Sequence, residues 1–172
     1  MVTKWAALLF LAVVVVIAFG SFATKALAAD KASTMELSKA LGRAKLFAGL
    51  TEKERSQLKS AATLRHCREG ERIIEQGKHL DRMFVLLEGE AEVKVSGKLV
   101  ATLPSQSLVG EVEFLDSLPA SSDVAILKDT QLIELNNALL TGLMKKQPRL
   151  GYVLMSQIAK TEGQRLRAMN QK

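Results

Sequence analysis

Residues that commonly carry out chemistry are few in this chain of 172 residues. The single cysteine, Cys67, follows His66, and the second histidine is His79. A structural zinc site takes about four cysteine or histidine ligands, which this chain does not supply. Arg65 and Arg68 lie close to the thiol, and a cationic setting of this kind is what a reactive cysteine requires. The simpler interpretation of the His66-Cys67 pair is packing in or beside a strand.

Sequence motifs of catalytic machinery are also missing. The chain contains no nucleophile elbow, no Walker loop and no metalloprotease helix. We therefore expect a protein that is not an enzyme and that holds no metal or cofactor. With only 11 glycines and 3 prolines the chain is neither fibrous nor disordered, and its length fits one globular domain with an appendage.

Helical patterns lie on either side of a central region. Apolar residues recur at helical spacing over residues 35–47, after a short polar connector at 29–35. Thr51-Glu52-Lys53-Glu54 fits a capping box, which predicts a helix from there to about residue 62. Helical spacing resumes after Asn136 and continues toward the C-terminus.

The central region has the pattern of short strands. From Leu64 onward, apolar and polar residues alternate between regularly spaced glycines. Ser96-Gly97-Lys98 predicts a hairpin turn, and further strands are expected at residues 122–127 and 131–135. The order helix, strands, helix predicts a mainly β fold with flanking helices, in which the strands form an antiparallel jelly roll or barrel.

The segment from Leu46 to Arg167 resembles the cyclic nucleotide-binding domain family. The resemblance rests on three stretches: Leu46-Phe47-Ala48-Gly49-Leu50-Thr51, Arg68-Glu69-Gly70-Glu71 with Ile74-Glu75-Gln76-Gly77, and the run MFVLLEGEAEV from Met83 to Val93. It implies the sensor fold of Crp/Fnr-like regulators without their DNA-binding part.

The family's ligand chemistry lies in a phosphate-binding cassette, which resembles residues 110–115 and 119–122 here. The resemblance implies that Glu111 accepts a hydrogen bond from a ribose 2′-hydroxyl and that the helix after Gly110 faces a cyclic phosphate. The candidate ligand-binding residues are Gly110, Glu111, Val112, Ser121 and Ser122. A turn glycine, a helix-capping glutamate and two surface serines would explain the same residues without a ligand.

Ala120 stands where the family carries its phosphate-pairing arginine. Losing that charge-assisted hydrogen bond removes about 1.5–3 kcal/mol, or about 10- to 150-fold in affinity. Asp123 would oppose a phosphate further if it faced one, and Pro104-Ser105-Gln106-Ser107 lacks the glycine usual at that loop. The cassette is therefore interpreted as degenerate, with a cyclic nucleotide kept as the alternative ligand.

The N-terminal region indicates contact with a membrane. Residues 5–24 carry no charge, and about 20 helical residues span the apolar core of a bilayer. We predict a membrane anchor or signal segment over 1–28, a linker with the first helix over 29–45, and the domain with its C-terminal helices over 46–172. Ala26-Leu27-Ala28 fits a cleavage site, so export to the periplasm after cleavage near Ala28 is the alternative to a single-pass anchor. Basic residues after the apolar run favour a cytoplasmic C-terminal domain.

Positive charge collects at the other end of the chain. Residues 137–172 carry one acidic residue, Glu162, and seven basic ones: Lys145, Lys146, Arg149, Lys160, Arg165, Arg167 and Lys172. An anionic lipid surface or an acidic partner is one interpretation, and a solvated helix face is the other. Regulators of this family place a helix-turn-helix after the final helix, whereas this chain ends at Lys172, so we expect no direct DNA binding.

Two functions remain in competition. The first is a membrane-tethered, non-enzymatic accessory module with a degenerate cyclic nucleotide-binding fold, acting as a small subunit on a larger membrane complex. The second is a sensor of cyclic AMP, cyclic GMP or a small anion that signals in trans to a partner protein, with the helix from Arg149 to Arg167 closing over the ligand.

Overall fold

The structure is a computed structural model that describes residues 33–171. The sheets and their flanking helices belong to one compact unit that begins at Leu37. The predicted membrane or signal segment at residues 1–28 lies outside the described residues. Among the residues that are described, no helix is both long enough and apolar enough to cross a membrane.

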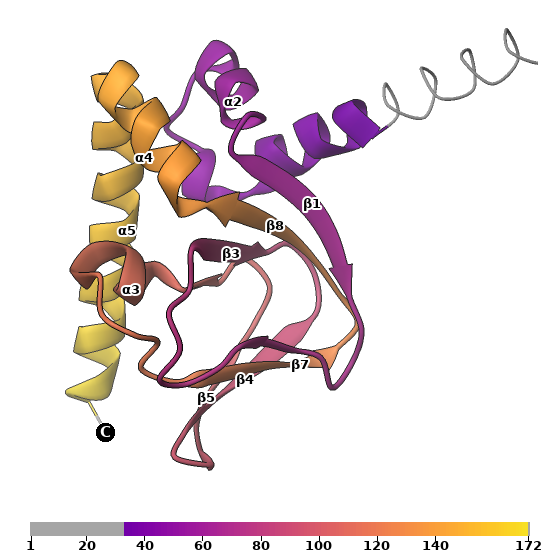
Figure 1. Ribbon diagram of the computed structural model, residues 1–172, viewed down its shortest axis with the longest axis vertical. Coiled ribbons are helices and arrows are strands. Elements are labelled where there is room, and N and C mark those ends of the chain that lie inside the picture. The colour runs from indigo at the N-terminus through magenta and orange to yellow at the C-terminus, as the bar shows by residue number, and fades with distance from the viewer. Residues whose placement is uncertain (1–32, 172) are drawn as a thin grey trace, which may run out of the picture. The chain divides into compact units, whose positions relative to one another are not determined.

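Helices precede and follow a block of strands (Figure 1). Residues 33–43 are helical and lead into a 3₁₀ turn, η1 (Lys45–Phe47), and helix α2 (Glu52–Leu58). The strands are β1 (Ala62–Cys67), β2 (Arg72–Ile74), β3 (Arg82–Leu86), β4 (Glu90–Val95), β5 (Lys98–Leu103), β6 (Leu108–Val109), β7 (Asp123–Lys128) and β8 (Thr130–Asn136). The remaining helices are α3 (Glu111–Asp116), α4 (Asn137–Lys146) and α5 (Pro148–Met169).

The strands form two antiparallel sheets of four, in the orders β1-β8-β3-β6 and β2-β7-β4-β5. The prediction of a mainly antiparallel β fold with flanking helices is therefore confirmed. The β4–β5 hairpin turns at Ser96 and Gly97, whose φ angles of 49° and 77° are those of a two-residue type I′ turn.

The capping box predicted before α2 is present in both of its halves. The Glu54 amide donates to the Thr51 hydroxyl over 3.3 Å, and the Thr51 amide donates to the Glu54 carboxylate over 2.8 Å. The predicted end of this helix near residue 62 is wrong, because the helix ends at Leu58. Ala62 is instead the first residue of β1, where it pairs with Leu135 of β8.

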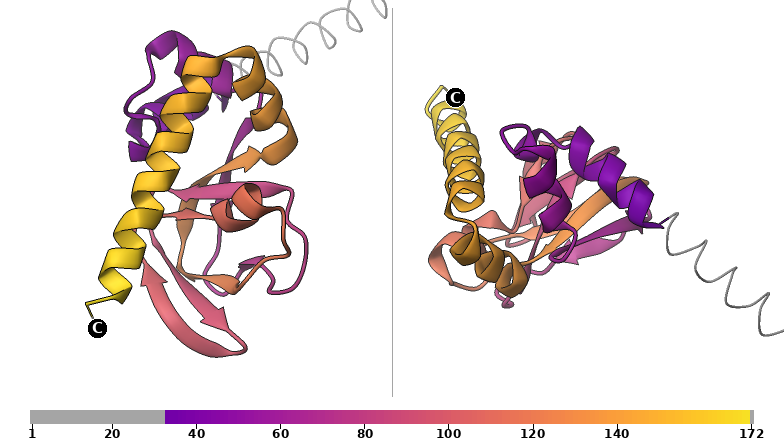
Figure 2. Two further views of the ribbon diagram at one scale, coloured as in Figure 1. Left: turned by 90° about the vertical axis from the view of Figure 1, so that its left-hand side faces the viewer. Right: turned by 90° about the horizontal axis from the view of Figure 1, so that it is seen from above.

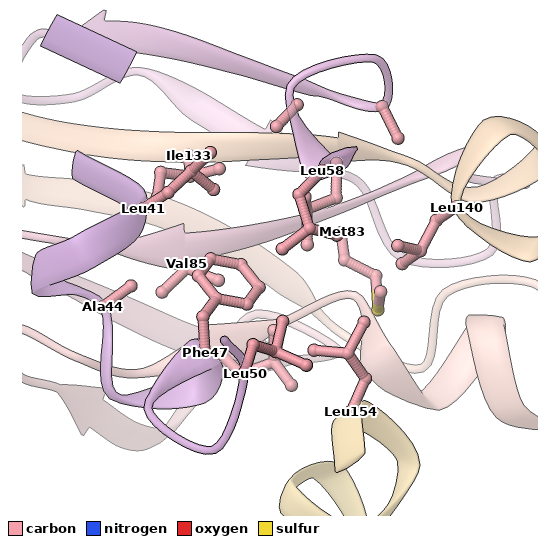
Figure 3. Close-up of a cluster of buried hydrophobic side chains, with 14 of the residues drawn as sticks. Leu41, Ala44, Phe47, Leu50, Leu58, Met83, Val85, Ile133, Leu140 and Leu154 are labelled. Carbon is pink, nitrogen blue, oxygen red and sulfur yellow. The ribbon is translucent and has the colours of Figure 1, made fainter. Parts of the chain in front are cut away.

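Strand β3 is buried on both faces, because helices cover one side of its sheet and the second sheet covers the other. Met83 and Val85 belong to the core beneath the helices, whereas Phe84 and Leu86 belong to the core between the sheets. Figure 3 shows the first of these cores, where side chains from the helices converge with those of β3 and β8 around Phe47. Burial on both faces accounts for the unbroken apolar run of this strand.

Helix α5 serves both the core and the region beyond it. Leu150, Leu154 and Ile158 are buried in the core beneath the helices. After Ile158 no further residue of α5 is buried, and the helix ends beside the β4–β5 hairpin (Figure 2). The C-terminal part of α5 is thus held next to the second sheet by a helix whose first part is fixed in the core.

Candidate functional site

A cavity of about 330 Å³ lies between α3, the sheet β2-β7-β4-β5 and the C-terminal part of α5. Apolar residues of β4 and β5, among them Val93, Val95 and Val100, supply much of its wall, and Met169 of α5 closes another side. This volume is within the range of small-molecule sites in proteins.

All five residues predicted from the cassette line this one cavity: Gly110, Glu111, Val112, Ser121 and Ser122. Gly110 precedes α3 with a φ of 81°, and a Cβ atom at this position would lie 2.9 Å from the carbonyl oxygen of Arg82. Only glycine fits both the backbone angle and this close approach. Gly110 thereby directs the first residue of α3, Glu111, toward the cavity.

Glu111 is the most unusual residue of the site, because its carboxyl group is buried and only half satisfied. The residue is 3% exposed. Its Oε1 atom accepts a hydrogen bond from the guanidinium of Arg165, whereas Oε2 has no hydrogen-bond partner among the described residues. Burial raises the pKa of Glu111 to about 7, against the lowering effect of Arg165 and with a smaller raising effect from Glu162.

Arg165 connects α5 to the cassette. Its guanidinium donates to Glu111, to the Glu162 carboxylate over 2.8 Å, and to the carbonyl oxygen of Leu108. Sequence reasoning counted Arg165 only as one of several basic residues at the end of the chain. A better signal was available in the helical spacing of Glu162, Arg165 and Met169, which places all three on one face of α5.

Ala120 also lines the cavity, at 8% exposure. Its backbone is fixed against the loop after β2, because the Ala120 amide donates to the Lys78 carbonyl over 2.9 Å and the Gly77 amide donates to the Ala120 carbonyl over 2.8 Å. A longer side chain at position 120 would therefore begin at the cavity wall. Asp123 does not line the cavity; its Oδ1 atom accepts from the Gln76 amide over 3.0 Å.

A second carboxylate of α3, that of Glu113, also borders the cavity. The amide of Leu80 donates to both of its oxygens, over 2.5 and 2.6 Å, and His79 Nδ1 lies 3.5 Å from Oε1. Glu113 therefore holds the loop before β3 against α3. The contacts of Glu113 and the burial of Glu111 thus fix the positions of the two acids in the first turn of α3.

The Cys67 region does not have the properties of a reactive thiol. Cys67 is buried, and burial raises the pKa of its thiol to about 11. The guanidinium of Arg65 pairs instead with the carboxylates of Glu71 and Glu134. Among the described residues no cluster of histidine, cysteine and acidic side chains could hold a metal ion.

Comparison with known proteins agrees with the fold. Residues 64–147 match the sequence profile of the cyclic nucleotide-binding domain. The chain is 31% identical over 91 residues to the cGMP-dependent protein kinase egl-4 of Caenorhabditis elegans, an alignment covering 53% of this chain and 11% of the kinase. It is 31% identical over 84 residues to the cAMP-dependent protein kinase regulatory subunit of Mycosarcoma maydis, covering 46% of this chain and 16% of the subunit.

Among solved structures, a cyclic nucleotide-binding domain from Methylobacillus flagellatus KT aligns with a TM-score of 0.67 at 20% identity. That alignment covers 78% of this chain and 79% of the other. The two curated relatives are much longer proteins, of which this chain spans 11% and 16%. The relationship therefore concerns the domain and its fold.

Proposed function

Because the chain belongs to the cyclic nucleotide-binding domain family over residues 64–147, we propose that it is a non-enzymatic regulatory module that senses a small ligand. In this proposal the ligand occupies the cavity beside α3, and helix α5 passes its presence on to a partner protein. The observation that carries the proposal is the contact between Arg165 of α5 and the buried carboxylate of Glu111. The relatives are described as cGMP-dependent and cAMP-dependent proteins, so these two nucleotides are the first ligands to test.

The architecture of α5 supports this role. The helix is anchored at Leu150, Leu154 and Ile158, so its first part moves only with the core. Its second part contacts the cavity through Glu162, Arg165 and Met169. A ligand that forms new contacts with these side chains, or breaks the contacts they make without ligand, changes the stability of the second part of α5. The first part is held by the core and is not affected.

The experiment is hydrogen–deuterium exchange of the 172-residue chain, purified in detergent because residues 5–24 are uncharged, with and without cyclic AMP or cyclic GMP. We expect saturating ligand to change the exchange of residues 159–169 and to leave residues 150–158 unchanged. Arg165→Met is expected to abolish this response, and Arg167→Met, an exposed position on the same helix, serves as the matched control. Ligand binding with identical α5 exchange would refute the proposal.

We also propose that this module is held at a membrane by residues 5–24 and acts on a larger membrane complex from the cytoplasmic side. The uncharged run in the sequence supports an anchor, and the exposed basic residues of the last two helices are available to anionic lipid or to an acidic partner: Lys145, Lys146, Lys160 and Arg167. The alternative is export to the periplasm after cleavage near Ala28. The intact mass of the protein recovered from whole cells tests this, since loss of residues 1–28 would exclude the anchor.

A further inference from the structure

The charges around the cavity are predominantly negative. Three carboxylates line it, those of Glu111, Glu113 and Glu162, against one guanidinium, that of Arg165. This guanidinium already contacts two of the three carboxylates. An anion entering the cavity would therefore meet an excess of negative charge and no free cation among the described lining residues, and the cost of burying such a charge is high.

On the cassette side of the cavity the described lining residues provide no compensating positive charge. Ala120 has no functional group, and the first turn of α3 already carries two acids, Glu111 and Glu113. Since α3 has only six residues, its dipole contributes little to binding an anion. The carboxylates of those two acids already interact with the positive end of this dipole. Ser121 and Ser122 offer neutral hydroxyls at most.

One residue of the cavity lining, Glu111, has a carboxyl oxygen without a hydrogen-bond partner among the described residues. Glu111 Oε2 is buried without a partner among the described residues, in a side chain that is 4% exposed. A buried carboxylate oxygen without a partner is costly, and a hydroxyl or ammonium group placed against it would remove that cost. Much of the rest of the cavity lining is apolar, including Val95, Val100 and Met169.

We propose that this cavity selects a small ligand without negative charge, such as a nucleoside, which presents a hydroxyl or ammonium hydrogen to Glu111 and an apolar ring to the β4–β5 wall. This inference rests on the proposed sensing function and defines the charge of its ligand. It predicts that removing the phosphate from a cyclic nucleotide improves binding.

The test is calorimetric titration of the full chain with two matched pairs, adenosine with cyclic AMP and guanosine with cyclic GMP. Within each pair the base and the sugar are shared and the phosphate charge differs. We expect the nucleoside to bind at least about tenfold more tightly than its cyclic nucleotide. The free-energy cost of burying an unpaired charge is larger than the free energy that a single hydrogen bond contributes. Glu111→Gln is expected to weaken the nucleoside and to strengthen the cyclic nucleotide, and circular dichroism confirms that the variant is folded.

Ala120→Arg supplies the missing cation and should strengthen cyclic AMP by about 10- to 150-fold with little effect on adenosine. Leu118→Arg is the matched control, because Leu118 is exposed, is two residues away and does not line the cavity. We expect Leu118→Arg to change neither affinity.

The outcomes separate this inference from the function on which it rests. Equal or tighter binding of the cyclic nucleotides by the unmodified chain would overturn the inference and leave the sensing function intact. If the Arg165→Met variant no longer binds the cyclic nucleotides, then in the unmodified chain the guanidinium of Arg165 breaks its contact with Glu111 and pairs with the phosphate instead. Binding of none of the four compounds up to about 1 mM, where association contributes only about 4 kcal/mol, would overturn both.

Discussion

Replacing Arg165 with methionine tests whether the buried ion pair holds α5 against the cassette. Methionine keeps most of the length and apolar character of the side chain and removes the guanidinium. The substitution deletes contacts to Glu111, to Glu162 and to the carbonyl oxygen of Leu108, and it leaves Glu111 as a buried acid without a cation.

The expected loss of folding stability follows from the exposed fractions of the two side chains, those of Arg165 and Glu111. Removing one partner of a buried ion pair costs about 3–5 kcal/mol. The side chain of Arg165 retains 33% exposure while that of Glu111 retains 4%, so solvent screens one partner and we expect about 2–3 kcal/mol at pH 8. Protonation of Glu111 limits the loss, because burial already raises its pKa to about 7 and removal of Arg165 raises the pKa further.

The loss is therefore expected to depend on pH. Below about pH 5.5 Glu111 is protonated in both proteins, so the variant should lose less than about 1 kcal/mol, the contribution of the remaining hydrogen bonds. Urea unfolding followed by circular dichroism at the two pH values measures both differences. Arg167→Met is the control for removing a positive charge from α5. Equal destabilisation by the two variants at pH 8, or a loss at Arg165 that does not change with pH, would refute the reasoning.

Three further predictions concern the rest of the domain. Hydrogen bonds from Arg149 lower the pKa of Glu54 to about 2, so the stability that Glu54 contributes is present above about pH 4.5 and is lost as the pH falls toward 2; Glu54→Gln should reduce this part of the acid sensitivity in unfolding curves measured across that range. Gly89→Ala should destabilise the domain by at least about 2 kcal/mol in urea unfolding, because φ is +83° and the new Cβ would lie 2.7 Å from the carbonyl oxygen of Asp129. Since burial raises the pKa of the Cys67 thiol to about 11, it should react with a disulfide reagent at pH 8 only after unfolding in urea, and fast reaction of the native protein would contradict its placement.

The features that could be predicted from the sequence are those set by neighbouring residues. The capping box needs only Thr51 and Glu54, and the hairpin needs only Ser96 and Gly97 between two alternating strands. The end of α2 was placed too late because Ala62 suits helix and strand alike. It is pairing with β8, more than sixty residues away, that makes Ala62 part of a strand.

The cassette residues could be predicted as a group because residues 110–115 and 119–122 resemble the phosphate-binding cassette of a known family. The contact that completes the site could not be, since Arg165 and Glu111 are 54 residues apart and α5 must first pack on the core before they meet. From the excess of basic residues near the C-terminus, Arg165 was predicted to be part of a basic surface. The orphaned Oε2 atom of Glu111 depends on three-dimensional burial and has no signal in the sequence.

We expect Glu111 to lower the stability of the folded protein. A residue that lowers stability suggests a role in binding. A carboxyl whose folded pKa is about 7 and whose ordinary value is 4.5 binds its proton more tightly in the folded state, so stability falls as the pH rises between these two values. Glu111→Gln removes this buried charge but also leaves Arg165 without a charged partner, so we expect it to recover only about 1–2 kcal/mol of stability above pH 7. We expect Glu111→Gln to be more stable than the unmodified chain at pH 8 and equal to it at about pH 5, where Glu111 is protonated. Glu69→Gln, at an exposed site, should leave the stability unchanged at both pH values.

Destabilisation of Glu111→Gln at pH 8 would mean that Glu111 serves mainly to hold α5. A gain in stability together with weaker nucleoside binding would identify Glu111 as a residue kept for the ligand at the expense of the fold.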